Sequence, residues 1–189
     1  QEQSGVAGIR NDGKEAASIF ADYNNDGYPD LYILREGGDV LYKNNGEGVF
    51  SDVSKEAMVD PDTGGTKPLF LDADHDGDLD LLIIRPVSNL LYRNNADGTF
   101  TEMAANMGLG LPVTNCTDAG FADFDEDGDL DLVMSHDEGS NFLFSNDRHG
   151  RFTDQTSGSG LGQSEGSQAV AVADYNNDGF NDVLFVSGA

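Results

Sequence analysis

The sequence has few basic residues, no tryptophan and a single cysteine. It carries 10 Lys and Arg against 35 Asp and Glu, which gives a formal net charge of -25 over 189 residues. Such a charge excludes nucleic-acid binding through phosphates, which needs a basic surface, and it disfavours docking on anionic lipid. Because Cys116 stands alone, neither an internal disulfide nor a cysteine-rich zinc site can form.

Long hydrophobic runs and N-terminal signals are also missing. Apolar runs such as Leu81–Ile84 are far shorter than the roughly 20 residues of a membrane-spanning helix, so we expect no membrane insertion. The chain starts at Gln1 without an initiator methionine or an apolar leader, and we therefore expect a processed or excised chain. Its length is sufficient for one ordinary domain with a hydrophobic core.

The acidic residues are concentrated in four nine-residue segments, which contain 16 of the 26 Asp residues. These segments are loop 1 (22–30, DYNNDGYPD), loop 2 (72–80, DADHDGDLD), loop 3 (123–131, DFDEDGDLD) and loop 4 (174–182, DYNNDGFND). Their first residues lie 50, 51 and 51 positions apart, a fixed period that indicates a stacked or radial repeat. Short apolar runs, rich in β-branched and aromatic residues, flank each segment and predict buried strands.

A second block recurs in three of the four units, at 41–50 (LYKNNGEGVF), 91–100 (LYRNNADGTF) and 143–152 (LFSNDRHGRF). An Asn- and Gly-rich turn between two short apolar strands predicts a hairpin. Each unit is thus predicted to contain four antiparallel strands in about 50 residues, which is typical of one propeller blade. Tyr42, Tyr92 and Phe144 share one position of this block, so we expect them in the blade core.

We predict an all-β fold of four-stranded antiparallel β-propeller blades, with about three and a half blades present. The whole chain, 1–189, forms a single repeat region with blade 1 at 16–56, blade 2 at 66–106, blade 3 at 117–157 and half of blade 4 at 167–189. Closed propellers typically have four to eight blades. We therefore expect a fragment of a larger ring, a ring completed by partner chains, or an open array. The incomplete blade invites strand addition, which makes a homo-oligomer or filament one of these expectations.

The four loops have the same pattern of oxygen-bearing side chains. Positions 1, 3, 5 and 9 are Asp or Asn in every loop, and position 6 is always Gly. Carboxylates that converge in a tight loop repel each other unless a cation is present. Ligation by oxygen alone favours Ca²⁺ over zinc or copper, and Mg²⁺ demands a stricter octahedron. We predict four Ca²⁺ sites, with position 7 contributing its backbone carbonyl. The predicted ligands are Asp22, Asn24, Asp26, Tyr28 and Asp30; Asp72, Asp74, Asp76, Asp78 and Asp80; Asp123, Asp125, Asp127, Asp129 and Asp131; and Asp174, Asn176, Asp178, Phe180 and Asp182.

Two other calcium motifs do not fit these loops. An EF-hand requires a bidentate Glu at position 12 and a helix on each side. Position 12 is instead occupied by Ile33, Ile83, Met134 and Phe185, and the flanking segments are predicted strands. The glycine-rich nonapeptide of calcium β-rolls is absent as well. Loops 2 and 3 have more carboxylates than loops 1 and 4, where position 3 is Asn, so we expect them to bind Ca²⁺ more tightly.

The pattern Asp-x-Asp/Asn-x-Asp-Gly-x-x-Asp between two strands resembles the FG-GAP repeat of integrin α-subunit propellers. The trailing Leu-Tyr-Arg-Asn-Asn-x-x-Gly-Thr-Phe is similar to the related VCBS-type repeats of secreted bacterial proteins and of cartilage acidic protein. This resemblance extends from about residue 16 to residue 189. It implies a β-propeller with Ca²⁺ in the loop between the first two strands of each blade, in an extracellular or periplasmic protein.

The remaining polar residues show no catalytic pattern, so we do not expect an enzyme. The acids outside the loops have no distinctive setting, and His75, His136 and His149 are interpreted as surface residues. Asn115 begins the only N-glycosylation sequon of the sequence, and this sequon is informative about glycosylation only in a eukaryotic source. We expect an extracellular, non-catalytic adhesion or assembly module with structural Ca²⁺ and an unidentified protein or glycan ligand. The alternatives are a lectin-like carbohydrate binder and a domain of a polysaccharide lyase.

Overall fold

The strands of the protein form successive antiparallel sheets that follow the repeat. The computed structural model describes residues 7–10, 14–59, 64–110, 115–161 and 166–187. Blade 1 contains β1 (Glu15–Ala21), β2 (Asp30–Arg35), β3 (Val40–Asn44) and β4 (Phe50–Asp52). Blade 2 contains β5 (Lys67–Leu71), β6 (Asp80–Ile84), β7 (Leu90–Asn94) and β8 (Phe100–Glu102). Blade 3 contains β9 (Cys116–Ala122), β10 (Asp131–His136), β11 (Phe142–Asn146) and β12 (Phe152–Asp154).

The fourth unit has two strands, β13 (Ser167–Ala173) and β14 (Asp182–Ser187), which form the half-blade. Each complete blade is a meander in which neighbouring strands pair in chain order. A short turn segment, α2 (Thr156–Ser159), precedes the half-blade, and its residues Ser157 and Gly158 have non-helical backbone angles. The predicted all-β fold of three and a half blades is therefore confirmed. No helix in the described part of the chain has the length and hydrophobicity needed to cross a membrane.

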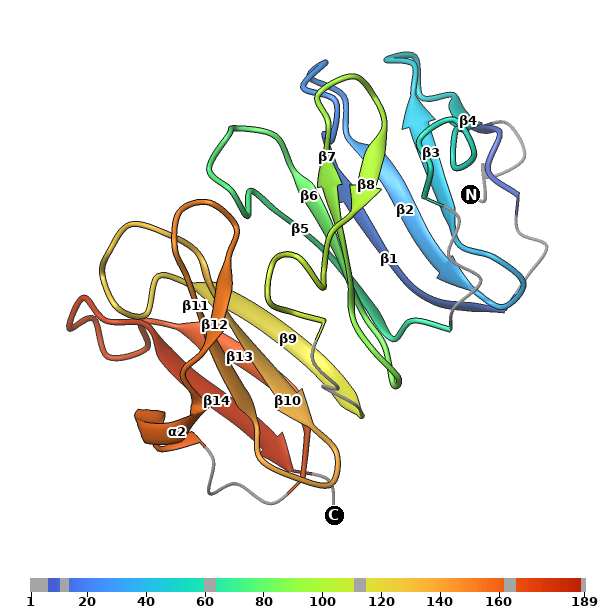
Figure 1. Ribbon diagram of the computed structural model, residues 1–189. Helices are drawn as coiled ribbons and strands as arrows, with labels where there is room; N and C mark the ends of the chain where they lie inside the picture. Colours follow the sequence, from blue (N-terminus) through green and yellow to red (C-terminus); the bar gives the residue numbers. More distant parts are fainter. Residues whose placement is uncertain (1–6, 11–13, 60–63, 111–114, 162–165, 188–189) are drawn as a thin grey trace.

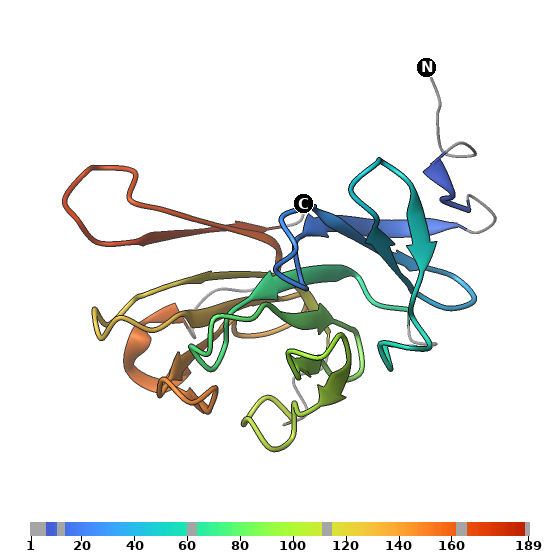
Figure 2. The same cartoon turned by 90° about the horizontal axis from the view of Figure 1, so that it is seen from above.

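The sheets stack against one another in chain order, from blade 1 (blue) to the half-blade (red) (Figures 1 and 2). The first strand of each sheet packs against the first two strands of the preceding sheet: β5 against β1 and β2, β9 against β5 and β6, and β13 against β9 and β10. One core cluster lies between blades 1 and 2 and includes Tyr32, Leu34 and Ile83. A second cluster lies between blades 2 and 3 and includes Leu82 and Met134. Burial of these apolar faces is the main force that holds neighbouring blades together.

The aromatic residues that recur in the trailing block are core residues, as predicted. Tyr92 lies in the first cluster and Phe144 in the second, whereas Tyr42 lies in a third cluster formed by β2 and β3 of blade 1. Tyr42, Tyr92 and Phe144 are 1%, 8% and 0% exposed. Cys116 is buried too, and burial raises the pKa of its thiol to about 11. It is therefore a core residue rather than a reactive thiol.

The trailing hairpins add polar links between blades. Asn94, at the end of β7, donates its side-chain amide to the Tyr23 carbonyl of blade 1 at 2.7 Å. Asn146, at the end of β11, makes the same bond to the Ala73 carbonyl of blade 2, also at 2.7 Å. Both Asn side chains are buried, so each bond satisfies a carbonyl that has little access to water. Loop position 2 of one blade is thereby joined to the hairpin of the next blade.

Candidate metal-binding loops

Each acidic loop is the turn between the first two strands of its sheet. In every unit the residue before the loop pairs with the Asp at loop position 9, which closes the turn; the pairs are Ala21–Asp30, Leu71–Asp80, Ala122–Asp131 and Ala173–Asp182. Position 6 needs glycine because its φ is +86° in Gly27 and +94° in Gly179, a conformation that side chains disfavour. The four loops therefore share one backbone path.

Backbone amides draw the carboxylate at position 1 into the loop. In loop 1, Asp22 accepts hydrogen bonds from the N–H groups of Asp26 at 3.1 Å and Gly27 at 2.8 Å. In loop 4, Asp174 accepts the equivalent bonds from Asp178 at 3.1 Å and Gly179 at 2.9 Å. Bonds of this kind favour the ionised carboxylate and fix its direction.

The side chain at position 5 is fixed by its own local bond. Asp26 accepts from the N–H of Tyr28 at 3.1 Å, and Asp76 accepts from the N–H of Asp78 at 3.0 Å. Loops 3 and 4 repeat this bond, with Asp129 and Phe180 as the donors. The oxygens at positions 1 and 5 are thus preorganised by the main chain in all four loops.

The Asp at position 9 lies deepest and ties the loop to the trailing hairpin. Asp80 is 1% exposed, and it accepts from the Ala73 N–H at 3.1 Å and from the Asn94 N–H at 2.7 Å. Asp131 has the same arrangement with Phe124 at 2.8 Å and Asn146 at 2.9 Å. Position 9 is therefore a structural anchor as well as a predicted ligand.

The hairpin Asn residues were predicted only as turn formers, and their role at the loop was missed. The available signal was their repeated spacing: Asn44, Asn94 and Asn146 follow the position-9 Asp of their own loop by 14, 14 and 15 residues. Such a fixed distance between two repeated polar residues is typical of a direct contact.

Burial of negative charge raises pKa values at position 9. Desolvation raises the pKa of Asp80 to about 7 and that of Asp30 to about 6, although backbone hydrogen bonds lower both. Neighbouring loop carboxylates add to the upward shift. The pKa of Asp131 is raised for the same reasons. A carboxylate in this setting gains from a nearby positive charge.

The donor set and two buried oxygen atoms fit a hard divalent cation. Carboxylate oxygens of Asp72, Asp74 and Asp76 lie within 4.8 Å of one another, as do those of Asp123, Asp125 and Asp131. Asp74 Oδ1 and Asp123 Oδ1 are buried and have no hydrogen-bond partner among the described residues. Buried, unpaired anionic oxygens are costly, and a cation in each of these two loops would remove this cost. Oxygen-only ligation is the preference of Ca²⁺.

Loops 1 and 4 bring fewer acidic side chains together than loops 2 and 3. Asn24 and Asn176 occupy position 3, and each accepts a backbone hydrogen bond from position 5, at 3.0 Å and 2.8 Å. The side-chain oxygens still face the loop backbone. The predicted difference in affinity between the two pairs of loops stays a prediction.

Neighbouring loops also touch through their side chains. Asn25, at position 4 of loop 1, donates to Asp78 at position 7 of loop 2, at 2.7 Å. His75, at position 4 of loop 2, lies 3.6 Å from the Asp129 carboxylate at position 7 of loop 3. Position 7 was predicted to contribute only its carbonyl, so these side-chain contacts are new. They place the first three loops in one continuous row along the molecule.

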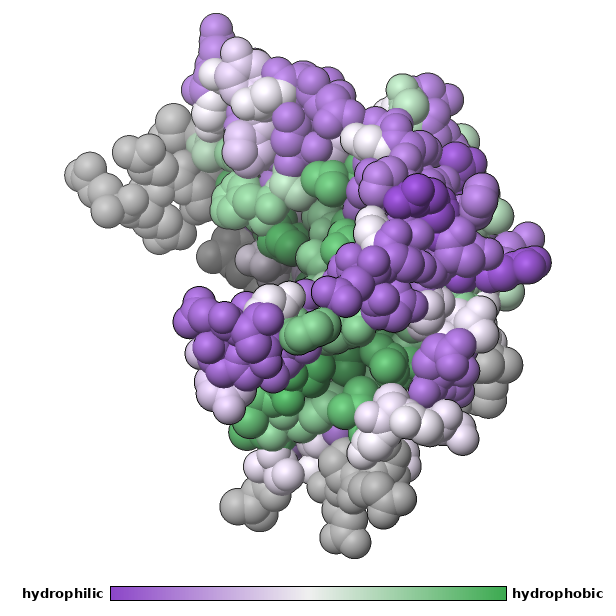
Figure 3. All heavy atoms as spheres, turned by 90° about the vertical axis from the view of Figure 1, so that its left-hand side faces the viewer, coloured by the Kyte–Doolittle hydropathy of each residue, from purple (hydrophilic) through white to green (hydrophobic). Residues whose placement is uncertain are grey.

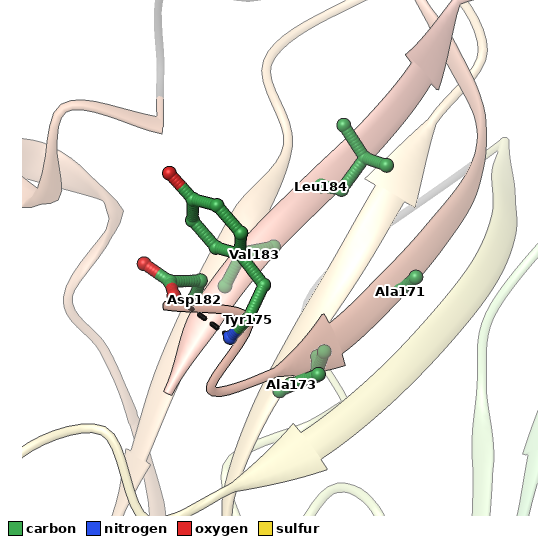
Figure 4. Close-up of a pocket in the computed structure, with 7 residues that line it drawn as sticks. Ala171, Ala173, Tyr175, Asp182, Val183 and Leu184 are labelled. Carbon is green, nitrogen blue, oxygen red and sulfur yellow. Dashed lines mark hydrogen bonds between the residues drawn. The ribbon is translucent and has the colours of Figure 1, made fainter. Parts of the chain in front are cut away.

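The half-blade carries a separate, apolar surface feature. Figure 3 shows hydrophobic residues gathered between polar regions on the side where β13 and β14 lie. A surface pocket of about 460 Å³ is lined by Ala171 and Ala173 of β13, Leu184 of β14 and Tyr175 of the loop between these strands (Figure 4). Tyr175 and Leu184 are 79% and 64% exposed. By contrast, Tyr32, which occupies the position of Leu184 in blade 1, is fully buried.

Comparison with known families gives one match that covers most of the chain. The model of the FG-GAP-like repeat family matches three overlapping segments, 22–83, 72–134 and 123–185. Each matched segment contains two successive acidic loops. A comparison with curated proteins finds no match.

The fold is shared with solved structures, among them the following three. An Agrocybe aegerita lectin that recognises non-reducing terminal N-acetylglucosamine is similar over 93% of this chain, with 21% identity and a TM-score of 0.55. The Vibrio cholerae biofilm matrix protein Bap1 is similar over 92%, with 16% identity and a TM-score of 0.55. The Photorhabdus luminescens Tc holotoxin pore is similar over 89%, with 19% identity and a TM-score of 0.52. This chain spans 47%, 28% and 8% of those three chains, respectively.

Proposed function

The chain belongs to the FG-GAP-like repeat family, and from this premise we propose that it is a non-catalytic binding module whose blades are stabilised by Ca²⁺. The ion in each loop would be held by side-chain oxygens at positions 1, 3, 5 and 9 and by the backbone carbonyl at position 7. It would supply positive charge and no reaction chemistry. The observation that carries this proposal is the presence of one buried oxygen in each of loops 2 and 3, Asp74 Oδ1 and Asp123 Oδ1, that has no hydrogen-bond partner in the described part of the chain.

The charge of the chain supports a structural role for the ions. Four Ca²⁺ ions, at +2 each, would change the formal charge from -25 to -17. Self-repulsion destabilises a compact state with a large net charge, and a ligand that binds only the folded state stabilises it. We therefore propose that Ca²⁺ binding and folding are coupled in this protein.

The expected affinity for Ca²⁺ supports a proposal on the compartment in which the protein works. Extracellular calcium modules bind in the range of about 10⁻⁴ to 10⁻³ M, and resting cytosol does not reach such Ca²⁺ concentrations. We propose that the protein works outside the cytoplasm, either secreted or at the cell surface.

Thermal denaturation with and without metal tests the structural role. The midpoint is expected to rise in millimolar Ca²⁺ and to fall in EDTA, with a smaller rise in equimolar Mg²⁺. Asp76→Asn should reduce the Ca²⁺-dependent rise, whereas Asp97→Asn, in an exposed hairpin turn, should not. Equal midpoints in Ca²⁺ and EDTA would contradict the proposal.

For the ligand, we propose a glycan or a protein bound at the surface of the propeller. The similarity to a lectin favours a carbohydrate as the first candidate, at the level of a shared fold. A glycan array probed in Ca²⁺ and in EDTA tests this candidate. Assays for polysaccharide lyase and hydrolase activity, with the same chelator control, test the catalytic alternative, and turnover would refute a purely binding role.

The half-blade supports a proposal on assembly. β14 pairs with β13, and no strand in the described part of the chain pairs with its other edge. An unpaired edge beside exposed Leu184 and Val186 is suited to strand addition. We propose that a neighbouring copy adds strands here and produces an oligomer or filament. Light scattering and negative-stain microscopy should detect larger species, and compact monomers at all concentrations would contradict this proposal.

A further inference from the structure

In each complete blade, one side chain of the third strand reaches back to the acidic loop of the same blade. This residue directly precedes the first hairpin Asn and is Lys43, Arg93 or Ser145. The contact is closest in blade 2. Arg93 Nε lies 2.5 Å from Asp74 Oδ2, and Arg93 Nη2 lies 3.2 Å from Asp76 Oδ2. The guanidinium thus contacts the carboxylates at loop positions 3 and 5.

The other two blades have weaker versions of this contact. Lys43 Nζ lies 3.6 Å from Asp26 Oδ2, so loop 1 also has a built-in cation at position 5. In blade 3, Ser145 donates a neutral hydrogen bond to Asp125 Oδ2 at 3.2 Å. Loop 3 therefore receives no positive charge from this position. Its own hairpin arginine, Arg148, pairs instead with the Asp129 side chain at loop position 7, at 3.1 Å, and this carboxylate is not among the proposed side-chain ligands.

A fixed positive charge at these carboxylates opposes the binding of a cation. Positions 3 and 5 are two of the four side-chain positions proposed to hold the ion. An arginine is permanently protonated, so Arg93 either stays beside the ion and repels it or leaves and gives up its own ion pairs. Both routes lower the affinity of loop 2. A unit charge about 6 Å from a divalent ion in water lowers the affinity about tenfold.

We propose that, in the three complete blades, the residue before the first hairpin Asn sets the Ca²⁺ affinity of the loop. Loop 3, with Ser145, is then the high-affinity site, and Arg93 weakens loop 2 despite its five Asp residues. This inference rests on the proposed function of the loops as Ca²⁺ sites. It revises the order expected from carboxylate number alone, which placed loops 2 and 3 together.

The same contact has an opposite effect on the protein without metal. Arg93 neutralises part of the charge in loop 2, so it should hold this loop together when Ca²⁺ is removed. The Arg93→Ser variant is therefore expected to have a lower denaturation midpoint than the wild type in EDTA, and a smaller deficit in saturating Ca²⁺.

The test is isothermal titration of the metal-free chain with CaCl₂. Loop 2 is measured with the other loops disabled by Asp22→Asn, Asp123→Asn and Asp174→Asn. Loop 3 is measured with the other loops disabled by Asp22→Asn, Asp72→Asn and Asp174→Asn. Arg93→Ser is expected to tighten the loop 2 site about tenfold. Ser145→Arg is expected to weaken the loop 3 site by a similar factor.

Arg151→Ser is the matched control, because it makes the same change in net charge. Arg151 is exposed, and no ion pair of its side chain is found among the described residues. It should alter either site less than twofold. Unchanged or weaker binding in Arg93→Ser, or unchanged binding in Ser145→Arg, would overturn this inference while leaving the metal sites standing. If the unmodified chain takes up no Ca²⁺ at millimolar concentration, both this inference and the proposed function are wrong.

Discussion

The buried amide of Asn94 offers a direct measure of the link between blades. Its side-chain nitrogen donates to the carbonyls of Tyr23 at 2.7 Å and Leu79 at 3.1 Å, and its oxygen accepts from the Ala96 N–H at 3.0 Å. Asn94→Ala removes all three bonds. It leaves the Tyr23 carbonyl without a partner at the interface between blades 1 and 2.

Asn44, at the same position of blade 1, is a matched control. Its side chain bonds to Pro29 at 3.0 Å and Gly46 at 3.0 Å, both within its own blade. The bond to Pro29 is exposed, so water can replace the amide. The backbone N–H of Asn44 still holds Asp30 after substitution, just as that of Asn94 still holds Asp80.

The expected difference follows from burial. A buried polar group left unpaired costs about 1–3 kcal/mol, so we expect Asn94→Ala to lower the free energy of unfolding by about 2–4 kcal/mol. Asn44→Ala should cost about 1 kcal/mol, as for an exposed hydrogen bond. Urea denaturation of both variants in the same buffer measures the two losses. Equal losses would refute the view that Asn94 joins the blades.

Two further predictions concern pH and backbone conformation. Metal-free protein should lose stability as the pH rises from about 4 to about 7. In the folded state the pKa of Asp30 is about 6 and that of Asp80 is about 7, both above the ordinary value of 3.8. The folded state therefore binds more protons than the unfolded state in this pH range, and it loses this advantage as the pH rises. Urea denaturation in EDTA at pH 5 and pH 8 measures the trend, and greater stability at pH 8 would oppose it. Gly108→Ala should be at least about 2 kcal/mol more destabilising than Gly48→Ala. Both glycines have a positive φ, so the backbone strain is similar in the two variants. Only the new Cβ at position 108 would lie 2.1 Å from the Phe152 carbonyl oxygen. Thermal denaturation compares the two variants, and similar midpoints would show that the close approach is tolerated.

The repeat made the fold predictable from the sequence. A period of 50 or 51 residues, apolar runs on each side of every loop and the Asn-rich hairpin together determined the number and order of strands. Tyr42 and Phe144 were assigned to the core because they recur at one repeat position, and both are buried. The division of the chain into blades at exact residue numbers stays a prediction, as do the metal ligands.

Contacts between repeats were not predictable in the same way. The bond between Asn25 and Asp78, and the approach of His75 to Asp129, join residues of different loops. Composition and period place each residue within its own unit, but the stacking of the blades decides which units touch. The role of Arg93 was missed for a related reason. A count of the carboxylates in each loop leaves out a cationic side chain that contacts the loop from a later strand of the same blade.

A high-resolution crystal structure grown in millimolar Ca²⁺ is the most direct examination of the acidic loops. It should show one ion in each loop, with oxygen ligands at about 2.3–2.6 Å from positions 1, 3, 5 and 9 and from the carbonyl at position 7. The anomalous signal of calcium would identify the ion. Loops that retain their hydrogen bonds but contain no ion under these conditions would contradict the claim that they are calcium sites.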